Sequence, residues 1–292
     1  MVTGAARGIG RAIAERLGDE GARVAVLDVS ASRTQQAVEE MHARGLQVAA
    51  HVVDVGQRDA VQRALAAVEA AWGPVGLLVN NAAWIRYQPV ADIDDETLER
   101  MLAVGVKGMV WTMQAALPGL QRSGHGAVVN ICSTAATRAT ADSIAYCAVK
   151  GAVAGLTRAA AIDLGRAGVR VNAVAPAFVP TPAALANFSG EAVARRAQST
   201  PLGRLATPQE IAAVPVAAPI SSAARRTSAS VRAQIVTSTP SRASAAAQPR
   251  PNPRLAAQTS ARLPAIPRSM VRVQACAGRT RRTWTTVAIA SV

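Results

Sequence analysis

Aromatic residues make up only 3% of the 292-residue chain, so a buried core has to be built mainly from Ala, Val, Leu and Ile. No apolar run approaches the about 18–20 residues that a membrane-spanning helix needs. No charged-then-apolar signal segment follows Met1. These absences weigh against membrane-spanning and ordinary secreted proteins, and they favour a cytoplasmic protein without a membrane partner.

Cysteine and histidine are also scarce. The three cysteines are odd in number and not closely paired, which argues against a disulfide framework and favours a reducing compartment. The three histidines are scattered, and no Cys/His spacing resembles a zinc site. We therefore predict no metal site.

The net charge of +14 is distributed very unevenly along the chain. Residues 211–292 contain 12 of the 32 basic residues, all of them Arg, and none of the 18 acidic residues. Residues 1–210 are left with 20 basic and 18 acidic residues, a balance of +2. The first part of the chain therefore has the charge of a near-neutral soluble enzyme.

The composition changes near Ala212. Residues 211–292 contain 8 of the 16 prolines but one of the 21 glycines, and they show no sustained helical or strand period. We predict a folded domain over 1–213 and an Arg/Ala/Ser/Pro-rich tail over 214–292 that is disordered. The abrupt loss of Lys, Asp and Glu suggests a frameshift near residue 214. Translation of the gene in the other two frames tests that hypothesis, and the absence of a family-like ending in either frame would refute it.

Within the first 213 residues, short apolar runs alternate with amphipathic segments. The predicted strands are 23–27, 48–53, 75–79, 127–131 and 169–174, and the predicted helices are 9–18, 31–44, 57–71, 94–122 and 143–166. The nearly continuous apolar character of the strands is typical of parallel strands covered on both faces. The alternation predicts an α/β fold with a doubly wound, mostly parallel, Rossmann-like sheet, its first strand truncated and its last strand missing.

A glycine-rich turn, Thr3-Gly4-Ala5-Ala6-Arg7-Gly8-Ile9-Gly10, stands where a first strand meets a first helix. Glycine permits positive φ and close backbone approach, so amides at the helix start can face a pyrophosphate. The turn alone is a weak signal for nucleotide binding.

Asp28 closes the next strand, 18 residues after Gly10, where an acid can accept hydrogen bonds from an adenosine ribose. Its carboxylate would repel a 2′-phosphate, which favours NAD over NADP. Arg7 favours NADP instead, because a cation in the loop can meet that phosphate. An alternative role for Asp28 is to cap the helix after Ser30.

Two later segments fit the same cofactor. Asp54 and Val55 end the third strand, where an acid and an adjacent amide can meet adenine. Asn81 and Ala82 follow the fourth strand, where small residues let the chain pass close to a dinucleotide. In isolation each segment is more typical of a simple turn than of a cofactor site.

Tyr146 and Lys150 are four residues apart on a predicted helix and so share a face. A phenol titrates near ~10 in water, and a neighbouring ammonium lowers that pKa towards neutral pH. Ser133 lies 13 residues before Tyr146, at a strand end, where its hydroxyl can meet a substrate oxygen. A Tyr/Lys pair at this spacing also occurs on ordinary solvated helix faces.

Taken in order, the glycine turn, Asn80-Asn81-Ala82, Ser133, Tyr146-X-X-X-Lys150 and Pro176-X-X-X-X-Thr181 resemble the short-chain dehydrogenase/reductase family. The resemblance covers about residues 1–213. It implies a nicotinamide-dependent oxidoreductase acting on a small alcohol or ketone, with a homo-oligomer as the usual assembly. The altered C-terminal part of this chain puts that assembly in doubt.

The same resemblance implies residue roles. Tyr146 would exchange the substrate proton, Lys150 would bind the nicotinamide ribose and depress the tyrosine pKa, and Ser133 would hold the reacting oxygen. Segment 182–200 would be a flexible substrate lid. The full set of predicted cofactor contacts is Gly4, Arg7, Gly8, Ile9, Gly10, Asp28, Asp54, Val55, Asn81, Ala82, Tyr146, Lys150, Pro176, Val179 and Thr181.

Further departures from the family pattern affect the expected activity. The chain begins at Met1-Val2-Thr3, which leaves almost none of the first strand and is consistent with a misassigned start or a true truncation. Gly105 stands where the family usually has the Asn that bends its helix and holds a water in the proton relay. We expect slowed or abolished turnover with cofactor binding retained, and faster turnover when Asn is restored. Ala177 replaces a usual Gly, a milder change.

Three functional classes remain open from the sequence. The first is an NAD-preferring alcohol dehydrogenase or ketone reductase, with NADP as the other cofactor. The second is a cofactor-binding protein with little catalysis, which Gly105 favours. The third is a nucleic-acid binder that uses the arginine-rich tail, although no folded reading motif or aromatic stacking series is visible. Trp84, Ile85 and Tyr87 are candidates for an apolar substrate pocket.

Overall fold

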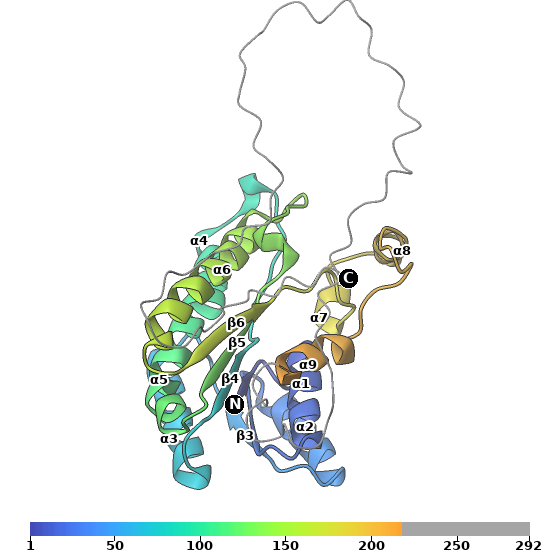
Figure 1. The fold of residues 1–292 in the computed structure, drawn as a ribbon. Helices are drawn as coiled ribbons and strands as arrows, with labels where there is room; N and C mark the ends of the chain where they lie inside the picture. The colour runs from blue at the N-terminus through green and yellow to red at the C-terminus, as the bar shows by residue number, and fades with distance from the viewer. Residues whose placement is uncertain (218–292) are drawn as a thin grey trace, which may run out of the picture. The chain divides into compact units, whose positions relative to one another are not determined.

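The computed structural model describes residues 1–217, with side chains described through Val214. Six parallel strands form one sheet in the order β3-β2-β1-β4-β5-β6 (Figure 1). The strands are β1 (Val2–Thr3), β2 (Val24–Asp28), β3 (Val48–Val52), β4 (Leu77–Asn80), β5 (Ala127–Ile131) and β6 (Arg170–Val174). The predicted Rossmann-like architecture is confirmed, and the order reverses between β1 and β4, where such sheets bind ligands.

Helices cover both faces of the sheet (Figure 1). One face carries α1 (Gly8–Asp19), α2 (Ala31–Ala43) and α9 (Pro208–Ala217), and the other carries α3 (Arg58–Trp72), α5 (Gly108–Arg122) and α6 (Ile144–Gly165). The shorter elements are η1 (Val90–Asp92), α4 (Asp95–Leu102), η3 (Thr134–Ala136), α7 (Pro182–Leu185) and α8 (Gly190–Gln198).

The apolar strands divide their side chains between two cores. In β2, Val24 and Val26 pack with α1, α2 and α9, whereas Ala25 and Leu27 pack with α3 and α5. Successive side chains of a strand point to opposite faces, so a strand buried on both sides has to be apolar throughout. This double burial explains why these strands lack a polar–apolar alternation.

The first strand is short but paired on both sides. Val2 pairs with Val26 of β2 and Val79 of β4, and Thr3 pairs with Leu27. The amino group of Met1 is fully buried and donates a hydrogen bond to the carbonyl of Leu77 over 2.9 Å. Burial lowers the pKa of this amino group to about 5. The short first strand that the sequence predicts is confirmed, and its two residues still anchor the turn that follows.

The helix predicted over 94–122 is wrong as a single continuous helix. A π-helical turn, η2 (Ala103–Lys107), separates α4 from α5, and Gly105 lies buried at its centre. A π turn inserts one extra residue into the helical ladder and so changes the helix direction. The α-helical ladder is therefore interrupted at Gly105, although the side chain of this residue is only a hydrogen.

The C-terminal part of the described chain is helical. Two helices, α7 and α8, lie within 182–200, the segment predicted as a flexible lid. The last described helix, α9, packs Ile211 and Ala212 against α1, and Val214 contacts the same core. Within residues 1–217, β6 is the outermost strand on its side of the sheet. The predictions for the tail, from residue 218 onward, lie outside the described residues.

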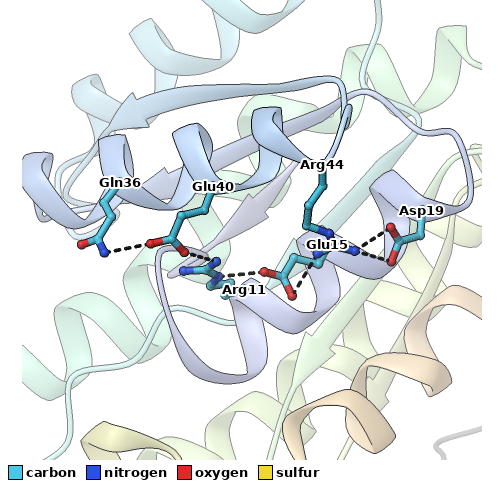
Figure 2. Close-up of polar contacts among 6 residues, drawn as sticks. All are labelled: Arg11, Glu15, Asp19, Gln36, Glu40 and Arg44. Atoms are coloured by element: carbon cyan, nitrogen blue, oxygen red, sulfur yellow. Dashed lines mark hydrogen bonds and ion pairs between the residues drawn. The ribbon is translucent and has the colours of Figure 1, made fainter.

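An exposed network of polar side chains joins α1 to α2. Its members are Arg11, Glu15, Asp19, Gln36, Glu40 and Arg44 (Figure 2). Arg11 pairs with a carboxylate on each helix, and Arg44 reaches back to Asp19 over 2.8 Å. Exposed pairs each contribute little to stability, about 0.2–1 kcal/mol. The network therefore links the two helices but contributes little to the stability of the fold.

Two findings bear on the functional class. Among residues 1–217, no helix is long and apolar enough to cross a membrane. In the same part of the chain, no group of three or more His, Cys, Asp or Glu side chains is arranged to hold a metal ion.

Candidate active site

The glycine turn sits at the carboxyl end of β1 and leads into α1. Gly4 and Gly8 have φ values of 62° and 60°, which L side chains rarely adopt. A Cβ on Gly10 would lie 2.3 Å from the Gly4 carbonyl oxygen, and one on Gly4 would lie 2.8 Å from the Cα of Ala82. Each glycine is thus required by conformation or by space, and the turn is held tightly against the end of β4.

Thr3 and Asn81 brace this turn. The Thr3 hydroxyl accepts hydrogen bonds from the backbone amides of Asn81 and Ala82, each over 3.0 Å. The Asn81 side-chain amide donates to the carbonyl oxygens of Thr3 and Gly4, also over 3.0 Å. The Asn81 side chain therefore holds the backbone of the glycine turn in place. The sequence predicted Asn81 only as a cofactor contact.

Asp28 lies at the end of β2, beside the same turn. Its carboxylate accepts hydrogen bonds from the Ala6 and Ser30 amides, both over 3.2 Å. The N-cap residue of α2 is Ser30, and no side chain caps that helix. The alternative role of Asp28 as a helix cap is therefore wrong, whereas its position next to the glycine turn agrees with the predicted ribose site.

The remaining predicted cofactor contacts flank the turn on both sides. Asp54 accepts a hydrogen bond from the Gly56 amide over 2.9 Å and lines a cleft beside α4. Val55 is buried against Gly108. Arg7 is exposed at the start of α1, and Ile9 packs on the core beside it.

The segment after β6 reaches the turn from the other side. Thr181 is the N-cap of α7, and its hydroxyl accepts a hydrogen bond from the Ala184 amide. A Cβ on Gly8 would lie 3.2 Å from the Cγ2 of Thr181, so the two segments are in close contact. Pro176 accepts a hydrogen bond from the Thr134 amide over 3.1 Å, which ties this segment to the end of β5, and Val179 is buried.

Ser133, Tyr146 and Lys150 come together where β5 ends and α6 begins. The Ser133 hydroxyl accepts a hydrogen bond from the Ala135 amide over 3.1 Å, and it lies close enough to the Tyr146 phenol to act on the pKa of that phenol. The Lys150 Nζ lies 6.0 Å from the centre of the Tyr146 ring and donates to the Ile131 carbonyl over 2.8 Å. The predicted constellation is thus assembled, with Lys150 almost fully buried.

Burial dominates the acid–base properties of this group. It lowers the pKa of Lys150 to about 8, and it raises the pKa of Tyr146 although the hydrogen bond to Ser133 acts in the opposite direction. The expected lowering of the phenol pKa by Lys150 is therefore not found, because desolvation outweighs the neighbouring polar groups. The thiol of Cys132, which contacts the Lys150 carbonyl, has its pKa raised by the same burial.

A series of buried, hydrogen-bonded polar side chains near the site was not predicted from the sequence. Thr112 donates to Asn80, Asn80 donates to Asn130, and Asn130 donates to Thr157, over 2.7 to 3.0 Å. All four side chains are at most 3% exposed. Asn80 and Asn130 occupy paired positions in β4 and β5, so a polar residue at the same depth in two neighbouring strands was the available signal. This series of hydrogen bonds connects both strands to α5 and α6.

The position of Gly105 is filled from the opposite helix. A Cβ on Gly105 would lie 2.4 Å from the Cγ1 of Val149, which is itself 4% exposed and adjacent to Lys150. Interior packing leaves no room for a further atom at that separation. A larger residue at 105 therefore requires a smaller one at 149.

Comparison with known proteins identifies this arrangement. The family model described as short chain dehydrogenase matches residues 1–192, about two thirds of the chain. The chain belongs to the short-chain dehydrogenase family. The resemblance drawn from the motifs is thereby confirmed, and the chain is an oxidoreductase of the short-chain dehydrogenase/reductase type.

Individual short-chain dehydrogenases resemble the chain over most of their length. It is 37% identical to the short-chain reductase protein NovJ of Streptomyces niveus, over 74% of this chain and 84% of that one. It is 35% identical to galactitol 2-dehydrogenase of Agrobacterium fabrum, over 72% and 86%. Among solved structures, actinorhodin polyketide ketoreductase with NADPH aligns with a TM-score of 0.71 and 33% identity, covering 76% of this chain and 89% of that one.

The residues around the glycine turn fit the nicotinamide cofactor that short-chain dehydrogenases use. The helix start at the turn contains two glycines, Gly8 and Gly10, and a Cβ at Gly4 or Gly10 would collide with its surroundings. Helix starts of this kind bind pyrophosphate through backbone amides. The cradle for a dinucleotide is therefore intact in this chain.

The packing at Gly105 changes the expected effect of substituting Asn, the residue that the family usually has at this position. Gly105→Asn alone is expected to lower stability by about 1–3 kcal/mol, because the new side chain overpacks against Val149. The double substitution Gly105→Asn with Val149→Ala is expected to recover that stability and to raise kcat above the value of the original chain. Urea unfolding and steady-state turnover of the two variants, with Val149→Ala alone as control, provide the measurement. Equal kcat in the double variant and the control would contradict the contribution expected of the restored amide side chain.

Proposed function

We propose that the chain transfers hydride between NAD and an alcohol or carbonyl substrate. The observation that carries the proposal is the convergence of Ser133, Tyr146 and Lys150 at the end of β5. The relatives named as sugar-alcohol dehydrogenases and reductases support the reaction class.

Each side chain has a distinct role in this proposal. Tyr146 takes the hydroxyl proton of the alcohol at its phenol oxygen, or returns it to the carbonyl. Ser133, which lies beside that phenol, holds the reacting oxygen. Lys150 contacts the ribose next to the nicotinamide and, when protonated, stabilises the phenolate. When bound, the nicotinamide supplies the hydride acceptor or donor.

The glycine turn binds the pyrophosphate, and Asp28 selects the cofactor. The Asp28 carboxylate is directed at the turn through the Ala6 amide, so a 2′-phosphate on the adjoining ribose would meet a negative charge. We therefore propose that NAD is preferred over NADP.

Asp28→Asn tests this preference while retaining the size of the side chain. The ratio of kcat/KM for NAD to kcat/KM for NADP is expected to fall by at least about tenfold, equivalent to about 1.4 kcal/mol, because the repulsion is removed. Asp59→Asn, an exposed acid in the first turn of α3, is the matched control and should leave the ratio unchanged. An unchanged ratio in Asp28→Asn would show that another residue sets the preference.

The reaction itself is tested with the purified full chain, NAD or NADP, and a panel of secondary alcohols and ketones. Formation or loss of reduced nicotinamide in proportion to substrate is the expected result. Failure of every alcohol and ketone to change the nicotinamide, with the cofactor bound, would reject the proposed reaction.

A second candidate function is cofactor binding with little catalysis. The specific observation in its favour is that Val149 occupies the space a side chain at 105 would need. Equilibrium binding of NAD without turnover over the same panel would select it.

A further inference from the structure

All phenyl-type rings of the chain gather in one place. The sequence contains two Tyr and two Phe, and these are Tyr87, Tyr146, Phe178 and Phe188. They come from the segment after β4, the start of α6, the segment after β6 and the connection between α7 and α8. The two main cores of the domain contain none of these rings.

The four rings form a continuous series that ends on the proposed catalytic phenol. Tyr87 lies 5.5 Å from Tyr146 and 5.3 Å from Phe188, measured between ring centres. Phe188 in turn meets Phe178 edge-on at 5.3 Å. These separations and tilts are those at which aromatic rings attract one another beyond simple burial.

Arg196 of α8 holds the outer end of the series. Its guanidinium carbon lies 4.0 Å from the centre of Phe188 and 5.3 Å from that of Phe178. One guanidinium nitrogen donates to the Ala192 carbonyl, and within residues 1–217 the side chain makes no ion pair with a carboxylate. The lid segment is thus attached to the site through rings and a cation stacked on them.

The surroundings of Tyr146 are apolar on the other side as well. Its ring packs on a small cluster built around Met101, Ala145 and Val149, which Trp84 also joins. Tyr87 is itself partly desolvated, and its burial raises the pKa of its phenol. A substrate that reaches the Tyr146 oxygen therefore enters between rings and aliphatic side chains.

We infer that the substrate is an aryl-substituted alcohol or ketone rather than a polyol. This inference rests on the proposed function. Tyr87 contacts both Tyr146 and Phe188, and an aromatic group that enters beside Tyr146 between these rings replaces any ring contact that its entry removes. A polyol would bring several hydroxyl groups against rings that offer few hydrogen-bond partners, and each unpaired hydroxyl weakens binding. The similarity to galactitol 2-dehydrogenase makes the polyol the natural alternative.

The experiment measures equilibrium binding by calorimetry to the full chain saturated with NAD. The probes are 1-phenylethanol, 2-butanol, which lacks the ring, and sorbitol. We expect 1-phenylethanol to bind at least about tenfold more tightly than 2-butanol, and sorbitol to bind no more tightly than 2-butanol. Steady-state kcat/KM for the same three alcohols should follow the same order.

Two variants locate the preference. Phe188→Ala is expected to reduce the preference for 1-phenylethanol over 2-butanol by about tenfold, whereas Phe188→Leu, which keeps apolar volume but not the ring, should reduce it less. Leu185→Ala, an exposed residue of the same segment, should leave the preference unchanged.

The possible failures are distinguishable. Oxidation of 2-butanol or sorbitol with NAD, without any preference for the phenyl compound, would overturn the inference and leave the proposed function intact. An equal loss of preference in Phe188→Ala and Leu185→Ala would also overturn it. Absence of binding and turnover for all three alcohols, with NAD bound, would overturn the inference, and failure of the whole alcohol and ketone panel would overturn the proposed function as well.

Discussion

Tyr146→Phe is expected to lower kcat by about a thousandfold, within the range that general acid–base groups contribute. The substitution removes the phenol oxygen, through which the substrate proton is exchanged, and keeps the ring. The contact with Tyr87 and the packing on the apolar cluster around Val149 are therefore retained. Steady-state turnover at saturating NAD and alcohol measures the effect.

The control for this variant is cofactor binding. The glycine turn is built from Gly4, Gly8 and Gly10 against Ala82 and Thr181, none of which depends on the Tyr146 hydroxyl. The Kd for NAD should therefore stay close to that of the original chain. A kcat within tenfold of the original would mean that another group carries the proton.

The pH dependence of turnover provides a second readout. Burial raises the pKa of Tyr146, so alcohol oxidation by the original chain should accelerate with rising pH as the phenolate fraction grows. The same burial lowers the pKa of Lys150 to about 8, so the amine loses its charge at a lower pH than that at which the phenol ionises. In Tyr146→Phe the residual rate of alcohol oxidation should lack the increase with pH that comes from ionisation of the phenol.

The sheet was largely predictable because the strands at its centre, β2, β4 and β5, are buried on two faces. β5 (Ala127–Ile131) agrees with its predicted bounds, and β2, β3 and β6 differ by one residue at one or both ends. The interruption of the helix between α4 and α5 was not predictable from periodicity, because a π turn shifts the register by one residue without changing composition.

The residues that form the site were predictable from the sequence, but their contacts and pKa values were less so. The structure brings Ser133, Tyr146 and Lys150 together as expected. Ser133 follows the end of a strand and the other two share one helix face, so the fold restricts where each side chain can lie. The opposing effects on the Tyr146 pKa depend on desolvation, which is a property of packing. The filling of the Gly105 position by Val149 joins residues 44 positions apart, and no local pattern reports it.

A chain prepared with Met1 as its N-terminus is expected to lose stability steeply as the pH falls from 8 to 5, because the amino group of Met1 is then buried. Its pKa is about 5 in the folded chain and 8.0 in the unfolded chain, so the unfolded state binds more protons between these values. Stability therefore rises with pH through this window. The three-unit difference corresponds to about 4 kcal/mol lost at pH 5 and below. Urea unfolding at a series of pH values measures it.

A chain extended by a few apolar residues ahead of Met1 removes the titrating group. The nitrogen of Met1 becomes an amide that can still donate to the Leu77 carbonyl, but it no longer has to lose a proton on burial. The extended chain should be more stable than the original at pH 5, and the two should converge above pH 8. His51 titrates in the same direction, because burial and the nearby amino group lower its pKa.

The variant His51→Gln separates the two contributions, because it removes the imidazole and leaves the amino group in place. It should keep most of the pH dependence, whereas the extended chain should lose most of it.

Parallel profiles for the original and extended chains would show that the buried amine does not control acid stability. In that case His51 or the carboxylates of the α1–α2 network would have to carry the effect, since Arg11 holds the pKa of Glu40 below its usual value. A group with a lowered acidic pKa loses its stabilising contribution only as the pH falls below about 4–5, so the two causes separate along the pH axis.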